Sequence, residues 1–389
     1  MSLKPSQILN NLNQKSKHFE AFDQSALRAL RTYQAALSQT AQEPETILQE
    51  RLKTFSRFDR GAEPLEPLGT WPDWVISSGL GWQNREESYA WVRDRLSGVS
   101  TFAVDGSQIY PGKDLSIPVA LVQVGWFENS HQDGQYSKDI DCEVMTPLDL
   151  RVNGSGEPVD RRVNMHRFAM EVRRLIQYLE ERAGCSTCLA FFDGSLVVTF
   201  AEVFDEETRR FYLQWVSRLV QASERCKVPL VSYIDTTYAR DLVVMLQRLL
   251  DLEEAPSLHD APLLGRGMQW GDRTPLFLCR RSGILSQYPS SVGQKIAFTY
   301  LKAHSGPPVR LELPLWLYEA GLHETVLDWV RGEIIIGGGY PYAIETADQT
   351  AVLTSEDRQI FFRLLQDWAE SHALNLRLSR KMVSKARRR

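Results

Sequence analysis

Two apolar, strand-like runs in this chain end in the same short acidic sequence. Val-Asp-Gly-Ser occupies positions 104–107 and Phe-Asp-Gly-Ser occupies positions 192–195. We expect each strand to end at its aspartate, Asp105 or Asp193, with the glycine in a tight turn and the serine offering a hydroxyl. One copy is typical of an ordinary turn, but two copies after buried strands predict two carboxylates at one sheet edge. Because these carboxylates would repel each other, the pair predicts a site for Mg²⁺ or Mn²⁺.

The order of the remaining elements predicts a mixed β-sheet. The first strands follow one another directly and are expected to form an antiparallel meander, whereas the later strands alternate with helices. The expected strands are 101–104, 117–127, 140–146, 188–196, 228–235, 274–279, 295–303 and 310–314, and the expected helices are 84–96, 160–183, 198–225, 238–252, 323–333 and 355–372. This order indicates an α/β fold in which helices pack on a mixed sheet.

Three regions differ in composition. Residues 1–98 include a polar, helix-prone stretch at 5–55, expected to form one or two long helices, and a loop rich in proline, glycine and tryptophan at 57–83. Residues 99–372 contain the strands. Residues 373–389 form a basic tail that we expect to be solvated, with phosphate contact as the alternative. We therefore predict an N-terminal helical region, one large domain and a tail.

The charge balance excludes a protein that coats nucleic acid through bulk attraction. The net charge is −4, whereas proteins of that kind are basic, so any nucleic-acid contact must be local. No apolar run is long enough for a membrane span, and the N-terminus lacks the apolar segment of a secretory signal. We therefore expect a cytoplasmic protein. The sequence also contains neither the nucleotide-binding motif G-x-x-x-x-G-K-[ST] nor a G-x-G-x-x-G that links a strand to a helix.

The five cysteines are odd in number and too sparse for a disulfide framework. Cys185 and Cys188 form a Cys-x-x-Cys pair, but no second pair or histidine lies at the spacing of a zinc site. We therefore interpret the two residues as reduced thiols in a loop before a strand.

Other acidic residues are candidate ligands. Glu171 lies at the edge of the apolar stripe of the 160–183 helix, and is either a boundary side chain or a third ligand. Asp235 ends a strand-like run and is either a ligand or the N-cap of the 238–252 helix, which we favour. Glu312 lies inside an expected strand, where it could face solvent.

A glycine-rich segment late in the chain carries two further candidates. The sequence GGGYPYAIETAD spans 337–348 and contains Tyr340 and Asp348. We interpret the segment as a mobile loop, in which glycine lets backbone approach a ligand closely. The hydroxyl of Tyr340 could orient a phosphate or a water molecule.

In order and spacing, these motifs resemble the NurA domain, the nuclease that works with the HerA hexameric ATPase in processing DNA ends. The resemblance runs from about residue 100 to residue 350. It rests on the succession VDGSQ, a helix with Met170 and Glu171, FFDGSL, GDRTPLF, FTYLK, RLELP and GYP.

The resemblance implies an RNase H-like core that cleaves DNA using manganese, with magnesium as a second choice, and family members that form homodimers on a HerA ring. It implies that Asp105, Glu171 and Asp193 are catalytic metal ligands and that Tyr340 is catalytic. Asp348 stands where the family usually has a histidine. A carboxylate there could still ligate a metal, but it cannot donate like an imidazole at neutral pH.

Three functions follow from these residues. The first is a manganese-dependent deoxyribonuclease that acts on DNA ends in repair with a HerA-like ATPase. The second is a catalytically weakened DNA-end adaptor of the same fold, which the aspartate at position 348 favours. The third is an ATPase or kinase of the actin type, because those proteins also place paired Asp-Gly-Ser/Thr turns around a magnesium nucleotide.

Overall fold

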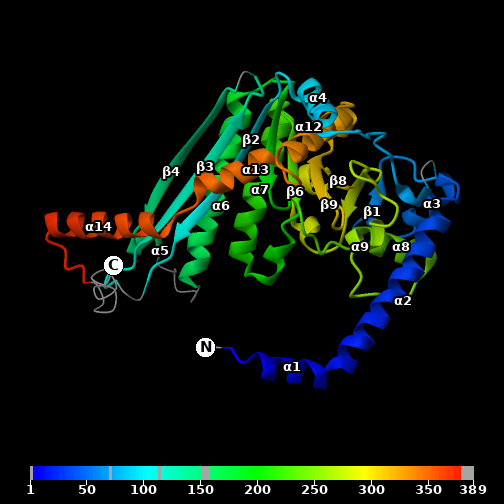
Figure 1. Cartoon of the computed structure of the whole chain (residues 1–389), viewed down its shortest axis with the longest axis horizontal. Helices are drawn as coiled ribbons and strands as arrows, with labels where there is room; N and C mark the ends of the chain where they lie inside the picture. The colour runs from blue at the N-terminus through cyan, green and yellow to red at the C-terminus, as the bar shows by residue number, and fades with distance from the viewer. Residues whose placement is uncertain (1–2, 70–71, 113–114, 133, 151–157, 378–389) are drawn as a thin grey trace. The chain divides into compact units, whose positions relative to one another are not determined.

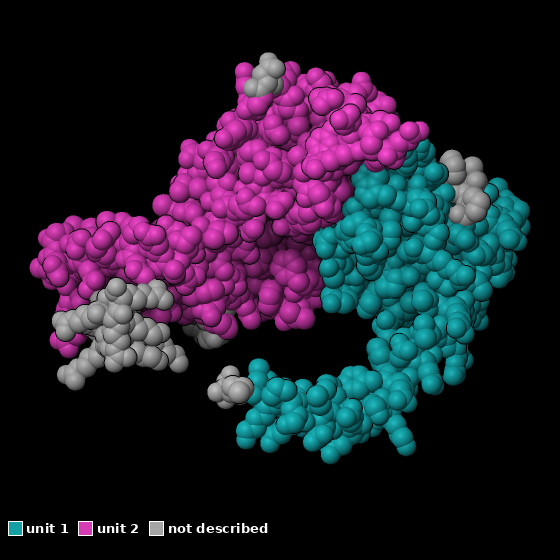
Figure 2. All heavy atoms as spheres, viewed as in Figure 1, with its two compact units in different colours: residues 1–81, 234–312 teal, residues 82–233, 313–389 magenta. Residues whose placement is uncertain are grey.

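The computed structural model describes residues 3–69, 72–112, 115–132, 134–150 and 158–377, and Figure 1 follows the elements along the chain. The chain divides into two compact units, each built from two separate segments (Figure 2). Unit 1 comprises Met1–Gly81 and Ile234–Glu312, and unit 2 comprises Trp82–Tyr233 and Leu313–Arg389. The boundaries expected after residues 98 and 372 rest on sequence pattern alone and stay predictions, and most of the basic tail lies outside the described residues.

The sheet of unit 2 combines an antiparallel meander with a parallel half. Its strands are β2 (Ser100–Ile109), β3 (Ala120–Asn129), β4 (Tyr136–Met145), β5 (Cys188–Asp193) and β6 (Leu230–Ile234). The spatial order is β6-β5-β2-β3-β4. Strands β2, β3 and β4 pair antiparallel, whereas β5 pairs parallel to β2 and β6 pairs parallel to β5. This topology, with helices on the sheet, is the RNase H-like mixed α/β core that the sequence predicts.

Helices cover both faces of this sheet. Helices α6 (Val159–Glu181) and α13 (Tyr342–Ala351) both pack against β2 and β3. A Cβ atom added to Gly106 would collide with side chains of α6, and one added to Gly125 would collide with the backbone of α13. Gly125 pairs with Asp105, the neighbour of Gly106, and neighbouring residues in a strand face opposite ways. The two helices therefore lie on opposite faces, and α13 crosses the strands in Figure 1.

The other helical elements of unit 2 are α4 (Arg85–Leu96), α5 (Pro147–Leu150), η3 (Thr199–Val203), α7 (Glu206–Cys226), α11 (Trp316–Glu319), α12 (His323–Ile336) and α14 (Ser355–Ser371). Helix α7 packs beside α6. It begins later than expected because Asp205 caps it, accepting a hydrogen bond of 2.9 Å from the Thr208 backbone nitrogen. None of the helices in the described ranges is long and apolar enough to cross a membrane.

Two local predictions for unit 2 were wrong. Strand β2 does not end at Asp105 but continues to Ile109, because β3 pairs with it along its whole length. The first Asp-Gly-Ser copy is therefore extended strand, whereas β5 does end at Asp193 and Gly194 turns with φ at +144°. The expected mobile loop at 337–348 is mostly helix, since α13 begins at Tyr342.

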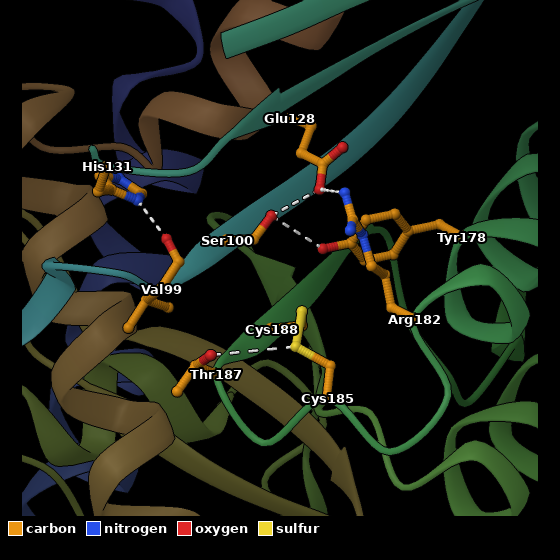
Figure 3. Close-up of a disulfide and its surroundings, with 9 residues drawn as sticks. All are labelled: Val99, Ser100, Glu128, His131, Tyr178, Arg182, Cys185, Thr187 and Cys188. Atoms are coloured by element: carbon orange, nitrogen blue, oxygen red, sulfur yellow. Dashed lines mark hydrogen bonds and ion pairs between the residues drawn. A yellow bond between two sulfur atoms is a disulfide. The ribbon is translucent and has the colours of Figure 1, made fainter. Parts of the chain in front are cut away.

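The prediction that the Cys-x-x-Cys pair consists of reduced thiols was also wrong. Cys185 and Cys188 form a disulfide, because the turn between α6 and β5 brings their Cα atoms to 5.6 Å, within the usual range. Figure 3 shows this disulfide beside a polar cluster in which the Ser100 hydroxyl donates to Glu128 at 2.7 Å. Arg182 pairs with the same carboxylate at 2.7 Å. The disulfide therefore lies at the start of β5, and Asp193 is the last residue of the same strand.

Unit 1 joins the N-terminal helices to a second group of strands. The helices α1 (Pro5–Gln14), α2 (Ser16–Thr40) and α3 (Glu45–Lys53) are the added helical region that the sequence predicts. Its other elements are η1 (Arg57–Asp59), β1 (Gly61–Pro64), η2 (Pro72–Trp74), α8 (Asp241–Leu250), α9 (Asp260–Leu264), β7 (Phe277–Arg280), η4 (Ile284–Gln287), α10 (Ser290–Gly293), β8 (Ile296–Leu301) and β9 (Val309–Pro314). The strands lie in the order β1-β7-β8-β9. The region expected to be a loop before residue 83 thus contributes β1.

A buried charge network holds unit 1 together. The Arg310 guanidinium lies 2.9 Å from the Asp241 carboxylate and 2.7 Å from Glu312. Arg281 also pairs with Asp241. Burial alone would raise the pKa of Asp241, but the two arginines outweigh burial and lower it. Glu312 is only 1% exposed, so the expectation that it could face solvent was wrong.

The capping role predicted for Asp235 was wrong as well. Helix α8 begins at Asp241, and its first amides donate to Asp260, at 2.9 Å for the Val243 nitrogen. Asp260 is the first residue of the later helix α9, so sequence spacing could not reveal this cap. Asp235 instead pairs with His304 at 3.2 Å.

We predict that Arg310→Met destabilises the protein by about 3–5 kcal/mol, because it leaves buried carboxylates without their counter-charge. The measurement is the midpoint of urea unfolding followed by circular dichroism. Arg51→Met is the matched control, since Arg51 pairs with Glu43 at 2.8 Å but its side chain is 45% exposed; it should change stability by less than about 1 kcal/mol. Equal effects of the two substitutions would contradict this view of the network.

Candidate metal centre

The first aspartate, Asp105, lies on β2 just beyond the point where β2 stops pairing with β5. Strand β5 pairs with β2 only from Ser100 to Ala103, and the last paired residue opposite Ala103 is Phe191. Asp105 lies two positions further along β2, and Asp193 lies two positions beyond Phe191. Because the strands run parallel, both carboxylates are carried past the end of the pairing in the same direction. The sheet thus brings the two Asp-Gly-Ser aspartates to one end of neighbouring strands.

Glu171 reaches the same place from helix α6. Its side chain is nearly buried and forms an ion pair with Arg167, one helical turn earlier. A Cβ atom at Gly106 would collide with the Glu171 carboxylate and would lie 2.8 Å from Cγ of Arg167. Arg167 also donates to the Gly106 carbonyl at 3.3 Å. The glycine of the first copy is therefore needed for the close approach of α6 and not for a turn.

Helix α13 brings Asp348 to the first aspartate. The Asp348 carboxyl lies close enough to Asp105 to raise the pKa of that carboxyl. The end of α13 is fixed to the sheet by the Ala351 carbonyl, which accepts from the Ser107 hydroxyl at 2.6 Å and from the Gln123 amide at 3.0 Å. The serine of the first copy therefore positions the helix that carries Asp348.

Tyr340 lies beside the second aspartate. Its hydroxyl donates to Oδ1 of Asp193 at 3.3 Å, which is long for a hydrogen bond of this type. Its ring packs edge-on against Tyr233, with ring centroids 4.9 Å apart. The ring of Tyr233 is completely buried. A buried neighbour thus orients the tyrosine that the sequence predicts to act at the site.

The carboxylates raise one another's pKa. The pKa of Glu171 is raised to about 7, because burial together with the charges of Asp105 and Asp193 outweighs the opposing charge of Arg167. Burial also raises the pKa of Asp105 to about 6, with a contribution from Asp348, against a backbone hydrogen bond at Gly106 that lowers it. Because the pKa values of Glu171 and Asp105 are both raised, nearby positive charge is too little to balance the ionised carboxylates.

The structure brings all five predicted site residues into one connected group. Asp105 contacts Asp348, Glu171 is within electrostatic range of Asp105 and Asp193, and Tyr340 contacts Asp193. Four carboxylates in such a group supply the hard oxygen ligands that Mn²⁺ and Mg²⁺ accept. Sequence reasoning missed Arg167, although its position four residues before Glu171 on a helix was a usable signal.

A second missed group holds the start of α13. The buried Glu333 carboxylate accepts from the Ala343 backbone nitrogen at 2.7 Å and from the Thr101 hydroxyl at 2.9 Å. It also pairs with Nε2 of His131 at 2.9 Å. The other ring nitrogen of His131 lies 2.8 Å from the Val99 carbonyl. Because both ring nitrogens face acceptors, these contacts favour the protonated form of the imidazole.

Comparison with known proteins assigns the chain to a family. The NurA domain family matches residues 99–353. The chain belongs to the NurA family. The matched region includes every candidate ligand and Tyr340, so the family's domain and the candidate metal centre coincide along the sequence. No curated protein is similar enough in sequence to be matched.

Solved NurA structures are similar to this NurA-family chain at low identity. The NurA nuclease from Sulfolobus solfataricus is 13% identical, with a TM-score of 0.48, and the match covers 74% of this chain and 93% of that one. A NurA structure with manganese is 12% identical, with a TM-score of 0.40 and coverages of 83% and 96%. A further NurA structure is 12% identical, with a TM-score of 0.42 and coverages of 72% and 94%. Membership of the family rests on the sequence match and gains nothing from these scores.

We predict that the contribution of His131 to the free energy of unfolding falls as pH rises. Burial lowers the pKa of His131, but Glu333 outweighs it and the net shift is upward. The stabilisation is therefore complete below the unfolded pKa of about 6.5 and is lost as pH rises through the folded pKa. The measurement is the free energy of urea unfolding at about pH 5.5 and at about pH 8.5, which lie on either side of about 6.5. Between these two pH values, that free energy should fall more for the wild-type protein than for His131→Gln. Parallel pH profiles would contradict the ion pair.

Proposed function

We propose that this chain is a metal-dependent nuclease that cleaves DNA at strand ends. Asp105, Glu171, Asp193 and Asp348 hold one or two Mn²⁺ or Mg²⁺ ions, and Tyr340 positions the phosphate or the attacking water. The observation that carries the proposal is the group of four carboxylates, two of them with raised pKa, beside the point where the pairing of strands β2 and β5 stops. Membership of the NurA family supports nuclease activity over an actin-type kinase.

The four carboxylates supply oxygen donors of the kind that divalent cations bind. Arg167 is the cation that pairs with Glu171, and its single charge does not prevent the pKa of that carboxyl from rising. A divalent ion between the carboxylates would offset their repulsion directly. Asp193 and Asp348 are exposed, so the group is accessible to a phosphate from solvent. Such a group needs little net positive charge on the protein, in agreement with the net charge of −4.

The chain's own residues divide the chemical work. A bound ion supplies polarisation of the scissile phosphate and a lower pKa for the attacking water. Tyr340 donates from its hydroxyl toward Asp193, so the same hydroxyl can donate to a phosphate oxygen or hold a water next to that carboxylate. Arg167 holds the Glu171 carboxylate in place, and the closeness of Gly106 limits its movement.

Asp348 favours a second candidate function, that of a DNA-end adaptor with weak catalysis. A carboxyl at this position raises the pKa of Asp105 and stands where an imidazole is expected. An aspartate lacks the imidazole ring that could protonate a leaving oxygen near neutral pH. The adaptor would bind DNA ends and the metal but leave the DNA uncut.

The partners come from the family resemblance. We propose that the chain acts in DNA repair with a HerA-like hexameric ATPase, as a homodimer in the cytoplasm. An ATPase that supplied the grip on DNA would explain why this chain needs no strongly basic composition. Co-purification with the ATPase and the mass of the complex in solution are the direct tests of these partners.

We predict Mn²⁺-dependent degradation of end-labelled linear DNA by the pure protein or by its complex with the ATPase. Asp105→Asn and Asp193→Asn should each lower the rate by at least about 100-fold, because each removes a metal ligand and keeps the side-chain size. Asp235→Asn is the control, since this acid pairs with His304, and it should keep nearly full activity. Wild-type protein that binds DNA and Mn²⁺ but leaves the DNA intact would establish the adaptor instead.

We also predict that Mn²⁺ raises the thermal midpoint of the wild-type protein in a concentration-dependent way, since a ligand of the folded state stabilises it. Asp348→Asn should weaken apparent Mn²⁺ affinity about 10- to 100-fold, as for loss of a residue that contacts a ligand. Asp348→His, which introduces the histidine usual in the family at this position, should cleave DNA at least as fast as the wild-type protein. An unchanged Mn²⁺ titration for Asp348→Asn would remove this residue from the ligand set.

A further inference from the structure

Glycines close the turn between helices α12 and α13 tightly. The Gly339 backbone nitrogen donates to the Ile334 carbonyl at 2.9 Å, and Gly338 takes a left-handed φ of +69°. Helices commonly end in this pattern, in which the chain leaves the helix direction. A Cβ atom added to Gly337 would collide with the carbonyl oxygen of Tyr340. The glycines of this segment therefore let the backbone of Tyr340 approach the end of α12 closely.

Helix α13 begins just after this turn and is capped from outside. Its N-cap residue, Pro341, has no side chain that can accept a hydrogen bond. The Ala343 backbone nitrogen instead donates to the Glu333 carboxylate of α12 at 2.7 Å. An anionic cap at a helix N-terminus satisfies one of the helix's first amides and interacts favourably with the helix dipole. Glu333 therefore holds the start of α13 against the end of α12, and Tyr340 lies in the chain between them.

Glu333 is itself fixed to the sheet. Its side chain is completely buried, accepts from the Thr101 hydroxyl at 2.9 Å and pairs with Nε2 of His131 at 2.9 Å. Figure 3 shows that His131 also faces the Val99 carbonyl, which lies 2.8 Å from its other ring nitrogen. Thr101 lies on β2, four positions before Asp105. The cap of α13 is therefore held by the strand that carries one of the candidate metal ligands.

Tyr340 lies midway between these two constraints. It follows Gly337 by three positions and precedes Ala343 by three. Its ring packs against the buried ring of Tyr233, with centroids 4.9 Å apart, and its hydroxyl lies 3.3 Å from Oδ1 of Asp193. Because backbone and ring are both held, the hydroxyl has little freedom to leave this place. A donor that is already in place lowers a reaction barrier more than a mobile one, since it needs no ordering during the reaction.

We propose that Glu333 and Gly337 are positioning residues that hold the Tyr340 hydroxyl beside Asp193. Glu333 is completely buried and Gly337 has no side chain, so both act through Tyr340. The inference rests on the proposed nuclease function. It goes beyond that function because it assigns the orientation of Tyr340 to contacts outside the group of carboxylates. The competing explanation is that Glu333 contributes to folding alone.

The first test is steady-state cleavage of end-labelled DNA with Mn²⁺, at a temperature where circular dichroism shows every variant to be folded. Glu333→Ala should lower kcat about 10- to 100-fold, because a small displacement of a positioned group has an effect of this size. It should change KM less than about threefold. Glu333→Gln keeps an oxygen that can accept from Ala343 and should recover most of the lost rate. Glu345→Ala is the matched control, since Glu345 is exposed on α13, and it should keep kcat within about twofold. An unchanged kcat in Glu333→Ala would overturn the positioning role.

The second test asks whether Glu333 acts through Tyr340. Tyr340→Phe removes the hydroxyl, so no donor is left for the cap to position. In the Tyr340→Phe background, Glu333→Ala should lower kcat less than about twofold, because the effects of residues that act as a unit do not add. Losses that multiply in the double variant would mean that Glu333 acts on folding or on another group, and would overturn the inference.

Gly337→Ala is a second variant, for the case that Glu333→Ala does not fold. It keeps the Glu333 carboxylate but forces the Tyr340 carbonyl oxygen to move. It should lower kcat about 10- to 100-fold, and this loss should also disappear in the Tyr340→Phe background. Gly81→Ala is its control, because a Cβ atom added there meets nothing within 4 Å. A wild-type kcat in Gly337→Ala would contradict the inference.

Hydrogen exchange separates failure of this inference from failure of the proposed function, because it needs no cleavage. Mass spectrometry of peptides covering 337–348 should show amide exchange at least about 10-fold faster in Glu333→Ala and in Gly337→Ala, since each variant disturbs a contact that holds the segment closed. Peptides covering β5 should exchange as in the wild type. Unchanged exchange of 337–348 in both variants would overturn the positioning role even if the enzyme cleaves DNA. Faster exchange in both variants of a protein whose wild type cleaves nothing with Mn²⁺ would support the positioning contacts and refute the nuclease.

Discussion

The repulsion between carboxylates at one end of β2 and β5 is the constraint on which the rest of unit 2 depends. Asp105 and Asp193 are brought together by parallel strand pairing, and Glu171 is added from the helix that packs over them. Burial makes each charge more costly, and the pKa values of Asp105 and Glu171 rise accordingly. Arg167 provides part of the missing positive charge. A divalent cation is the proposed source of the remainder.

The surrounding fold is built to keep this costly group together. Helices α6 and α13 approach the sheet closely from opposite faces, and glycines at positions 106 and 125 provide the space. The Ala351 carbonyl and the Glu333 carboxylate fix the two ends of α13 by hydrogen bonds. Close backbone contact of this kind leaves little freedom for the carboxylates to separate. Rigid elements on both sides thus oppose the repulsion that would otherwise spread the group.

The two copies of the acidic motif illustrate how one sequence serves two structural purposes. In the first copy the glycine permits close contact with α6 and the serine holds α13, within a strand that continues. In the second copy the strand ends, Gly194 turns with a positive φ, and the chain enters the segment with Phe200. The first copy therefore builds the site's framework, and the second ends the strand that carries Asp193.

Glu171, Tyr340 and Asp348 gained their proposed roles from the resemblance to the NurA domain, whereas the sequence by itself determined the mixed sheet, the long helices, the N-terminal helical region and the paired aspartates Asp105 and Asp193. These follow from apolar periodicity and from the strand-end acids, which are local signals. Only the tertiary structure decided that β2 continues past Asp105, because that depends on pairing with β3 along its whole length. It likewise decided that Asp260 caps α8, that Cys185 and Cys188 are bonded, and that Asp348 lies on a helix against Asp105. Each of these depends on which residues meet in space, and no local pattern in the chain records such meetings.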